Sequence, residues 1–187
     1  MIEWLEEFYG DDLRTSLLAS LAPLFAGYAR EIWLAEGGRG SPPAAFVSGL
    51  AAAYADHHLN SSRIQLQELV KEAGPDGMLD AVRERLDEWS DSRPEKVAAN
   101  ETIRTSNAIA IEHMRSEGVV TKVWSASGSD TCPYCEAIDG TAVEIERSFF
   151  SPGDSFQPEG ADTPLTFTSE IGGPPCHRGC VCSVRPA

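Results

Sequence analysis

The sequence predicts an α+β protein in which a helical region, residues 1–118, precedes a small β/loop module, residues 119–187. Apolar residues recur at helical spacing through the first part. The second part contains seven glycines and seven prolines in 69 residues, a content that disfavours long helices. All five cysteines lie in the last 56 residues, so the two parts also differ in the chemistry that they can perform.

Composition and charge narrow the classes of function. The chain has 187 residues, of which 42% are apolar and 24% charged, as in ordinary globular proteins. No run of about 18 apolar residues predicts a membrane span, and the acidic segment 1–7 is unlike the basic start of a signal peptide. The net charge of −14 and the scattered positions of the 15 lysines and arginines disfavour a nucleic-acid-binding face.

Capping and breaking residues mark the first helices. Asp11 and Asp12 predict the start of a helix that ends near Glu36, before two glycines. Pro23 lies inside this span and predicts a kink or a division into two shorter helices. The segment Ser41-Pro42-Pro43 predicts the start of a second helix, because serine caps helices and proline is tolerated in their first turn.

Glycine and proline divide the rest of the helical region. The segment Gly74-Pro75-Asp76-Gly77 is predicted to break the second helix. We expect a third helix over residues 77–90 and a fourth from Pro94 to Gly118. The apolar stripe of the second helix is predicted to contain Phe46, Leu50, Ala53, His57 and Ile64. His57 is therefore expected to be a packed side chain rather than a metal ligand.

The module of residues 119–187 is predicted to hold two strands, residues 119–125 and 141–145, both rich in β-branched residues. Residues 151–175 are rich in Pro, Gly, Ser and Asp and are predicted to form loops. A segment of this composition lacks the apolar side chains for a strong core of its own. Small modules with that deficit usually depend on a disulfide or a metal.

The cysteines predict a metal rather than disulfides. An odd number of cysteines, in a chain without a predicted signal peptide, disfavours a disulfide framework. Cys132-Pro133-Tyr134-Cys135 is a CxxC turn, and residues 176–182 hold the other three cysteines and a histidine. Two ligands from each segment complete the tetrahedral sulfur and nitrogen site that is typical of structural zinc. We expect one structural Zn²⁺, with these ligands: Cys132, Cys135 and two of His177, Cys180 and Cys182.

Cys176 directly follows Pro174-Pro175 and is expected to be a spare thiol. The five thiols and one histidine exceed the four positions of a tetrahedral ion. A catalytic zinc keeps an open coordination position, so this surplus of donors favours a structural role. A zinc deaminase would also need a His-x-Glu element before a Pro-Cys-x-x-Cys, and His113, which precedes Met114 and Arg115, does not provide it.

A redox site is the other interpretation of the CxxC turn. Cys132-Pro133-Tyr134-Cys135 after a strand resembles the active site of glutaredoxins, in which a helix N-terminus lowers the pKa of the first thiol. Gly140 is expected to stop any helix here after one turn, and the predicted helices come before the strands, so the βαβ surroundings are missing. We expect no enzyme, with a thiol-disulfide oxidoreductase as the alternative.

A series of motifs in residues 95–187 resembles one known family. In order, they are Arg104-Thr105 and Asn107 in a helix, Trp124 at the end of a strand, residues 127–135 with the CxxC turn, Ile138-Asp139-Gly140, Phe149-Phe150 and residues 174–182. This order and spacing resemble the phage head-morphogenesis proteins of the phage Mu protein F type. Arg178, Val181 and Ser106 depart from the residues usual in that family, but the metal-capable residues are kept.

The resemblance implies a minor capsid protein of a tailed phage or prophage. Such a protein would be present in few copies in the capsid interior, near the portal, after assembly in the cytoplasm of the infected bacterium. Its role would be in head assembly or DNA delivery, and its partners would be the portal protein or the major capsid protein. The strong negative charge agrees with protein partners and with no direct nucleic-acid binding.

Overall fold

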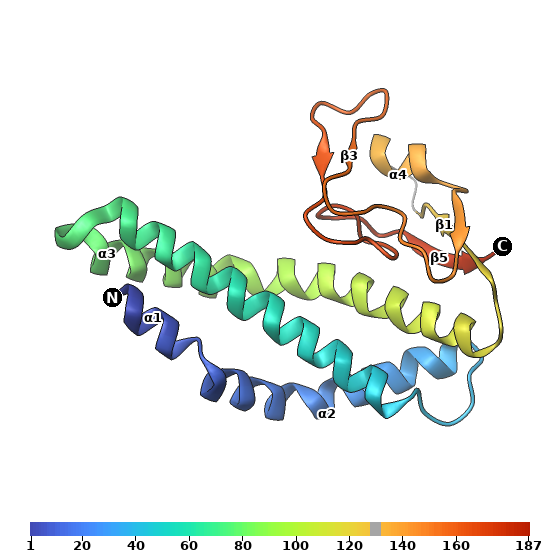
Figure 1. Cartoon of the computed structure of the whole chain (residues 1–187), viewed down its shortest axis with the longest axis horizontal. Coiled ribbons are helices and arrows are strands. Elements are labelled where there is room, and N and C mark those ends of the chain that lie inside the picture. Colours follow the sequence, from blue (N-terminus) through green and yellow to red (C-terminus); the bar gives the residue numbers. More distant parts are fainter. Residues whose placement is uncertain (128–131) are drawn as a thin grey trace. The chain divides into compact units, whose positions relative to one another are not determined.

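The structure, a computed structural model, describes residues 1–127 and 132–187 and has the predicted α+β class (Figure 1). The helices are α1 (Ile2–Phe8), α2 (Asp11–Ala35), α3 (Ala44–Ser116) and α4 (Pro133–Ile138). The strands are β1 (Thr121–Ser125), β2 (Ala142–Glu144), β3 (Ser155–Phe156), β4 (Leu165–Thr166) and β5 (Ser183–Pro186). Within these described ranges, no helix is long and apolar enough to cross a membrane.

The chain forms two compact units. The helical unit consists of residues 1–30 and 41–96, and the C-terminal unit consists of residues 31–40 and 97–187. The division by contacts therefore passes through α2 and α3, whereas the composition changes near residue 118, where helix gives way to strand. The end of α2, from Glu31, and the end of α3, from Val97, belong to the same unit as the strands that follow α3.

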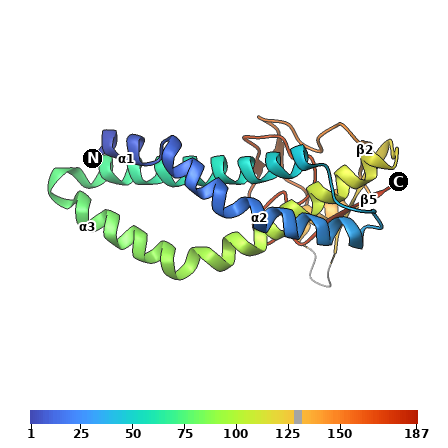
Figure 2. The same ribbon diagram turned by 90° about the horizontal axis from the view of Figure 1, so that it is seen from below.

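The predicted helix starts and stops are largely confirmed. The first long helix, α2, covers Asp11–Ala35 and continues through Pro23 as one element. The residues Ser41-Pro42-Pro43 lie directly before α3. At Gly74 the backbone leaves the helical conformation, with φ 68° and ψ −179°, and the chain reverses direction there (Figure 2, green). Only glycine adopts this φ without strain, which explains the break.

The prediction of separate third and fourth helices is wrong. The chain stays helical through residues 91–93 and through Pro94, up to Ser116. Proline inside a helix removes one backbone hydrogen bond, a cost that the helix can bear when the turns on both sides are regular. The short helix α1 was not predicted either, because seven residues are too few to show a clear apolar period.

The predicted apolar stripe on the first part of α3 is also wrong. Its buried positions are Ala51, Ala55, Ser62, Leu66 and Val70, whereas Ala53, His57 and Ile64 are exposed. The buried residues recur at helical spacing, but several of them are small. Small side chains let neighbouring helices approach closely, so a face of alanine and serine can be buried while larger apolar residues lie outside.

The helical unit has its own apolar core and one specific ion pair. Leu5, Leu66 and Val70 are buried together, and they join α1 to both sides of the turn at Gly74 through further apolar contacts. Arg14 of α2 donates to the carboxylate of Asp56 of α3 through Nε at 2.6 Å and Nη2 at 3.1 Å. This two-point contact fixes the orientation of the two side chains.

The C-terminal unit is built on a three-stranded antiparallel sheet in the order β2-β1-β5. The two predicted strands are confirmed over shorter bounds, as β1 and β2. The strand β5 was not predicted, and the region predicted as loops contains the small hairpin of β3 and β4. In the central strand, Trp124 pairs with Val184 and is fully buried. The sheet therefore brings residues just after β1 and just before β5 to the same end.

Candidate metal centre

The CxxC turn is tied to the central strand. Cys132 is the N-terminal cap of α4, and Pro133 occupies the first turn, where a missing backbone N–H leaves no bond unmade. The helix ends after six residues at Ile138, before Gly140, whose φ of 73° suits glycine. The N–H of Gly140 donates to the carbonyl of Trp124 over 2.9 Å. The prediction that Gly140 ends a short helix is confirmed.

The second cysteine segment is a tight turn that leads into β5. The N–H of Cys180 donates to the carbonyl of His177 over 3.3 Å, and Gly179 between them has a φ of 78°. Cys182 lies directly before Ser183, the first residue of β5. Because β5 pairs with β1 antiparallel, this turn reaches the end of β1 from which the CxxC turn departs.

Four donor atoms form the core of the candidate metal centre. They are the sulfurs of Cys135, Cys176 and Cys180 and a ring nitrogen of His177, and all lie within 4.8 Å of one another. The sulfurs of Cys135 and Cys180 are 3.7 Å apart. Two sulfurs that bind one tetrahedral ion at about 2.3 Å each are about 3.8 Å apart. The five cysteines are all free thiols, so no disulfide accounts for these short distances. The group therefore has the spacing of metal ligands.

The ring of His177 is oriented for metal binding. Its Nδ1 lies 2.8 Å from the carbonyl oxygen of Arg178, and since a carbonyl only accepts, Nδ1 carries the proton. The lone pair of a neutral ring is then on Nε2, which faces the sulfurs of Cys132 at 3.0 Å and Cys135 at 3.2 Å. A histidine that donates its other N–H to a carbonyl is the common arrangement at protein metal sites.

The thiols influence one another strongly. The interaction with the Cys176 thiol lowers the pKa of Cys180 to about 5. Burial raises the pKa of Cys135, and the interaction with Cys180 raises that of Cys176. The neighbours of one thiolate therefore stay protonated in the absence of a cation. A bound metal ion reverses this preference, because metal coordination deprotonates thiols outright.

The structure brings together most of the predicted ligands and adds one. Cys135, His177 and Cys180 belong to the four-donor group, and Cys132 and Cys182 lie at its edge, in contact with His177 and Cys135 respectively. Cys176, which the sequence analysis set aside, belongs to the group. Its spacing from Cys180, CxxxC, lies within the usual range for zinc ligands and was the signal for it.

An apolar shell surrounds the sulfurs. Trp124, Ile138, Cys135, Cys180 and Cys182 form one buried cluster, and the ring of Phe149 meets Trp124 edge to face at 5.1 Å. The exposed fractions of Cys135, Cys180 and Cys182 are 4%, 3% and 2%. Burial raises the pKa of Cys182. The shell keeps water from these three sulfurs, whereas Cys132, Cys176 and His177 are half-buried.

The helix α3 reaches this centre through Asn107. The side chain of Asn107 is buried, and its Nδ2 donates to the carbonyl of Cys182 over 3.1 Å and to that of Ile103 over 2.9 Å. The first of these bonds joins residues 75 positions apart in the sequence. Asn107 therefore fixes the backbone of one cysteine to a helix.

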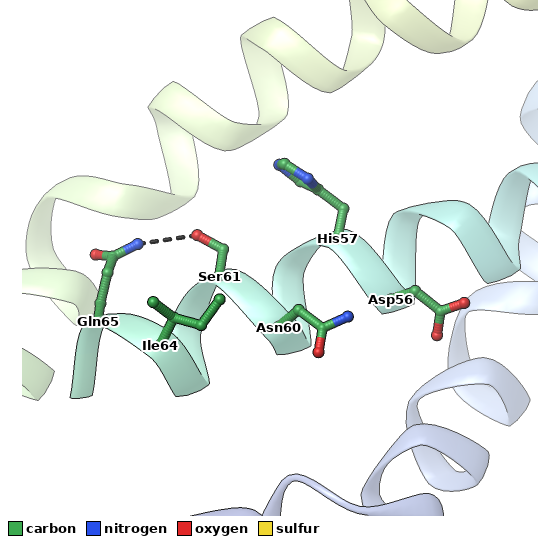
Figure 3. Close-up of a pocket in the computed structure, with 6 residues that line it drawn as sticks. All are labelled: Asp56, His57, Asn60, Ser61, Ile64 and Gln65. Atoms are coloured by element: carbon green, nitrogen blue, oxygen red, sulfur yellow. Dashed lines mark hydrogen bonds between the residues drawn. The ribbon is translucent and has the colours of Figure 1, made fainter. Parts of the chain in front are cut away.

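A second feature, a surface hollow, lies in the helical unit. Its lining comes entirely from the first part of α3, as Figure 3 shows: Asp56, His57, Asn60, Ser61, Ile64 and Gln65. Gln65 donates to the hydroxyl of Ser61 over 2.9 Å. Within residues 1–127 and 132–187, the groups of three or more candidate metal ligands do not include this hollow. His57 is exposed here, contrary to the packed position expected.

The fold and the site together define an α+β protein with a helical unit and a Cys/His cluster that could hold a metal ion. A comparison of the chain with models of protein families, with curated proteins and with solved structures finds no match. The chemistry of the site therefore carries the argument that follows.

Proposed function

We propose that the Cys/His cluster binds structural zinc and that the protein is a non-enzymatic minor capsid protein of a tailed phage or prophage, acting in head morphogenesis near the portal. The observation that supports the first part is the four-donor group of three sulfurs and one imidazole nitrogen, which two separate segments contribute. The second part is supported by the motif series in residues 95–187.

The donor chemistry favours zinc. Thiolate and imidazole are the ligands of tetrahedral structural zinc sites, whereas magnesium and calcium take oxygen donors. The ring orientation of His177 presents a lone pair to the sulfurs of Cys132 and Cys135. Zinc bound here would join the CxxC turn to the segment before β5, and its binding free energy would become folding free energy for the C-terminal unit.

The same geometry disfavours catalysis. A catalytic zinc keeps one position for water or substrate, but this centre has more donors than one ion can bind, and Cys135, Cys180 and Cys182 are buried. A redox CxxC needs an accessible thiol of lowered pKa. Here the second thiol, Cys135, is buried and burial raises its pKa. The first thiol, Cys132, is half-buried, and the helix that follows it has only six residues. A thiol-disulfide oxidoreductase remains the alternative that the experiment below separates.

Exposed apolar side chains support a role in protein assembly. Trp4 and Phe8 of α1 stack at 5.0 Å with about half of each residue exposed, and Leu24 of α2 is 67% exposed. Aromatic anchors contribute much of the binding energy in protein interfaces. We propose the portal protein or the major capsid protein as partner, in the capsid interior, with no direct DNA contact because the chain carries a net charge of −14.

Co-purification tests this proposal. The full chain is expressed with the portal protein or the major capsid protein of the same phage, and the captured partner is identified. We expect capture of one of them, weak dependence on salt, and loss of capture in the variant Trp4→Ser/Phe8→Ser, with Ser20→Ala as an exposed control. Capture of neither protein would contradict the head-assembly role, as would submicromolar binding to duplex DNA that falls steeply with salt.

Thiol reactivity separates the two candidate functions. In the zinc-bound protein we expect the thiols to resist alkylation and to react after chelation. Five freely reacting thiols in protein purified without chelator, together with turnover of a disulfide substrate, would favour the oxidoreductase and contradict the structural zinc.

A further inference from the structure

We propose that the cluster holds two metal ions rather than one, bridged by the sulfurs of Cys135 and Cys180. This inference rests on the proposed metal-binding function and extends it to the arrangement of the ions. One ion would have Cys132 and His177 as its other ligands, and the second would have Cys176 and Cys182.

The number of donors fits two ions. The C-terminal unit holds five thiols and His177, which together offer six ligand atoms. Two tetrahedral ions have eight coordination positions in all. Six ligands fill these positions when two of them bind both ions and the other four bind one ion each. A single ion would leave two of the six donors unused in a buried centre.

The sulfurs of Cys135 and Cys180 are placed as bridges. Each would bind both ions, so their separation must be close to one edge of a tetrahedron, about 3.8 Å, as it is for two ligands of a single ion. They lie 3.7 Å apart. Both are buried in one cluster with Cys182, and Cys132 and Cys176 pack against this cluster.

The remaining donors fall into two pairs on either side of the bridge. His177 Nε2 lies 3.0 Å from the sulfur of Cys132 and 3.2 Å from that of Cys135, so these atoms can surround one ion. The sulfur of Cys176 lies within 4.8 Å of those of Cys135 and Cys180, and Cys182 is buried in one cluster with both bridging residues. These two sulfurs can therefore complete the coordination of the second ion.

Charge does not oppose the second ion. Three thiolates, a neutral imidazole and one divalent ion carry a net charge of −1. Five thiolates, the same imidazole and two divalent ions also carry −1. The two-ion centre thus adds four metal–ligand bonds without adding net charge to a site in which three of the five sulfurs are buried. It also uses Cys132 and Cys182 as ligands.

Metal stoichiometry tests the inference on the full chain, purified under reducing conditions without chelator. We expect two zinc ions per chain in the unaltered protein and one in the variant Cys182→Ser. The control Ser183→Ala, one residue further on and exposed, should keep two. One zinc per chain in the unaltered protein would overturn the two-ion centre and leave the structural zinc intact. No zinc in the folded protein would overturn both.

Cobalt(II) provides a second measurement that needs no variant. Cobalt is titrated into the metal-free protein, and its paramagnetic resonance signal is followed. We expect the signal to rise during the first equivalent and to fall during the second, because bridging thiolates couple the spins of two neighbouring ions. A signal that rises in proportion to cobalt over both equivalents would show separate ions and overturn the bridge, as would saturation at one equivalent.

Discussion

The side-chain oxygen of Asn107 accepts a hydrogen bond of 2.8 Å from the backbone N–H of Val184, 77 residues further along the chain. The amide nitrogen of the same side chain donates to the carbonyl of Cys182. One buried residue of α3 therefore holds both ends of the short segment that joins the last cysteine to β5. The helix, the sheet and the candidate metal centre meet at this residue.

We predict that Asn107→Leu destabilises the C-terminal unit. The substitution keeps a similar volume but leaves the N–H of Val184 and the carbonyl of Cys182 buried without partners. Each unsatisfied group costs about 1–3 kcal/mol, so the two together should lower the free energy of unfolding by about 2–6 kcal/mol. Urea unfolding of the metal-loaded protein measures this. Ser116→Ala, which removes an exposed bond to His113, serves as control and should change stability by less than about 0.5 kcal/mol.

Two glycines should respond oppositely to alanine. A Cβ at Gly38 would lie 2.3 Å from Nε1 of Trp33, whose buried ring also meets His113 edge to face at 4.9 Å. We expect Gly38→Ala to cost about 1–3 kcal/mol, because the ring must shift. Gly49 lies in α3 with nothing within 4 Å of the added atom, so Gly49→Ala should stabilise by about 0.5–1 kcal/mol. Equal effects in thermal unfolding would contradict this account.

The two prolines of α3 should also respond differently to substitution by alanine. Pro94 lies inside the helix, where it removes a backbone hydrogen bond, and Pro94→Ala should stabilise the protein by about 1–3 kcal/mol. Pro75 follows the break at Gly74 and so stands in a first turn, where its missing N–H has no partner to lose. Pro75→Ala should have little effect. An equally small effect of both variants would mean that the chain is interrupted at Pro94 as well.

The ion pair between Arg14 and Asp56 predicts that the stability of the helical unit depends on pH. The hydrogen bond from Arg14 lowers the pKa of Asp56 below its ordinary value of 3.8. A lowered carboxyl pKa contributes stability above the unfolded pKa, and this contribution is lost as the pH falls through the folded value. Asp56→Asn should therefore be less stable than the unaltered protein near neutral pH, and the difference should shrink as the pH falls below 3.8 and through the lowered folded pKa. A difference that stays constant as the pH falls through this range would refute the ion pair.

Local signals predicted the ends of helices well. Asp11 and the Ser41-Pro42-Pro43 segment begin helices as expected, and the chain turns at Gly74, because capping and positive φ are properties of single residues. The stripe of α3 and the continuous helix through Pro94 could not be predicted in this way. Which face of a helix is buried depends on how closely its neighbours approach, and this is decided by tertiary packing.

The candidate centre could be predicted as a cluster but not in detail. Two short segments with ligand spacing made a joint site the simplest arrangement, and the structure brings them together. The place of Cys176 depends on how the backbone runs between Pro175 and Gly179, which spacing alone does not fix. The hydrogen bonds of Asn107 could not be predicted either, because they depend on β5. This strand has four residues and no apolar alternation of its own.

Hydrogen exchange with and without chelator tests the central claim, that metal bound at the Cys/His cluster holds the C-terminal unit together. We predict that chelation removes amide protection in β1, β5 and α4, whereas residues 44–70 of α3 keep theirs, because their apolar contacts do not involve the metal. Added zinc should restore the lost protection. Equal protection of both units after complete removal of the metal would contradict the account.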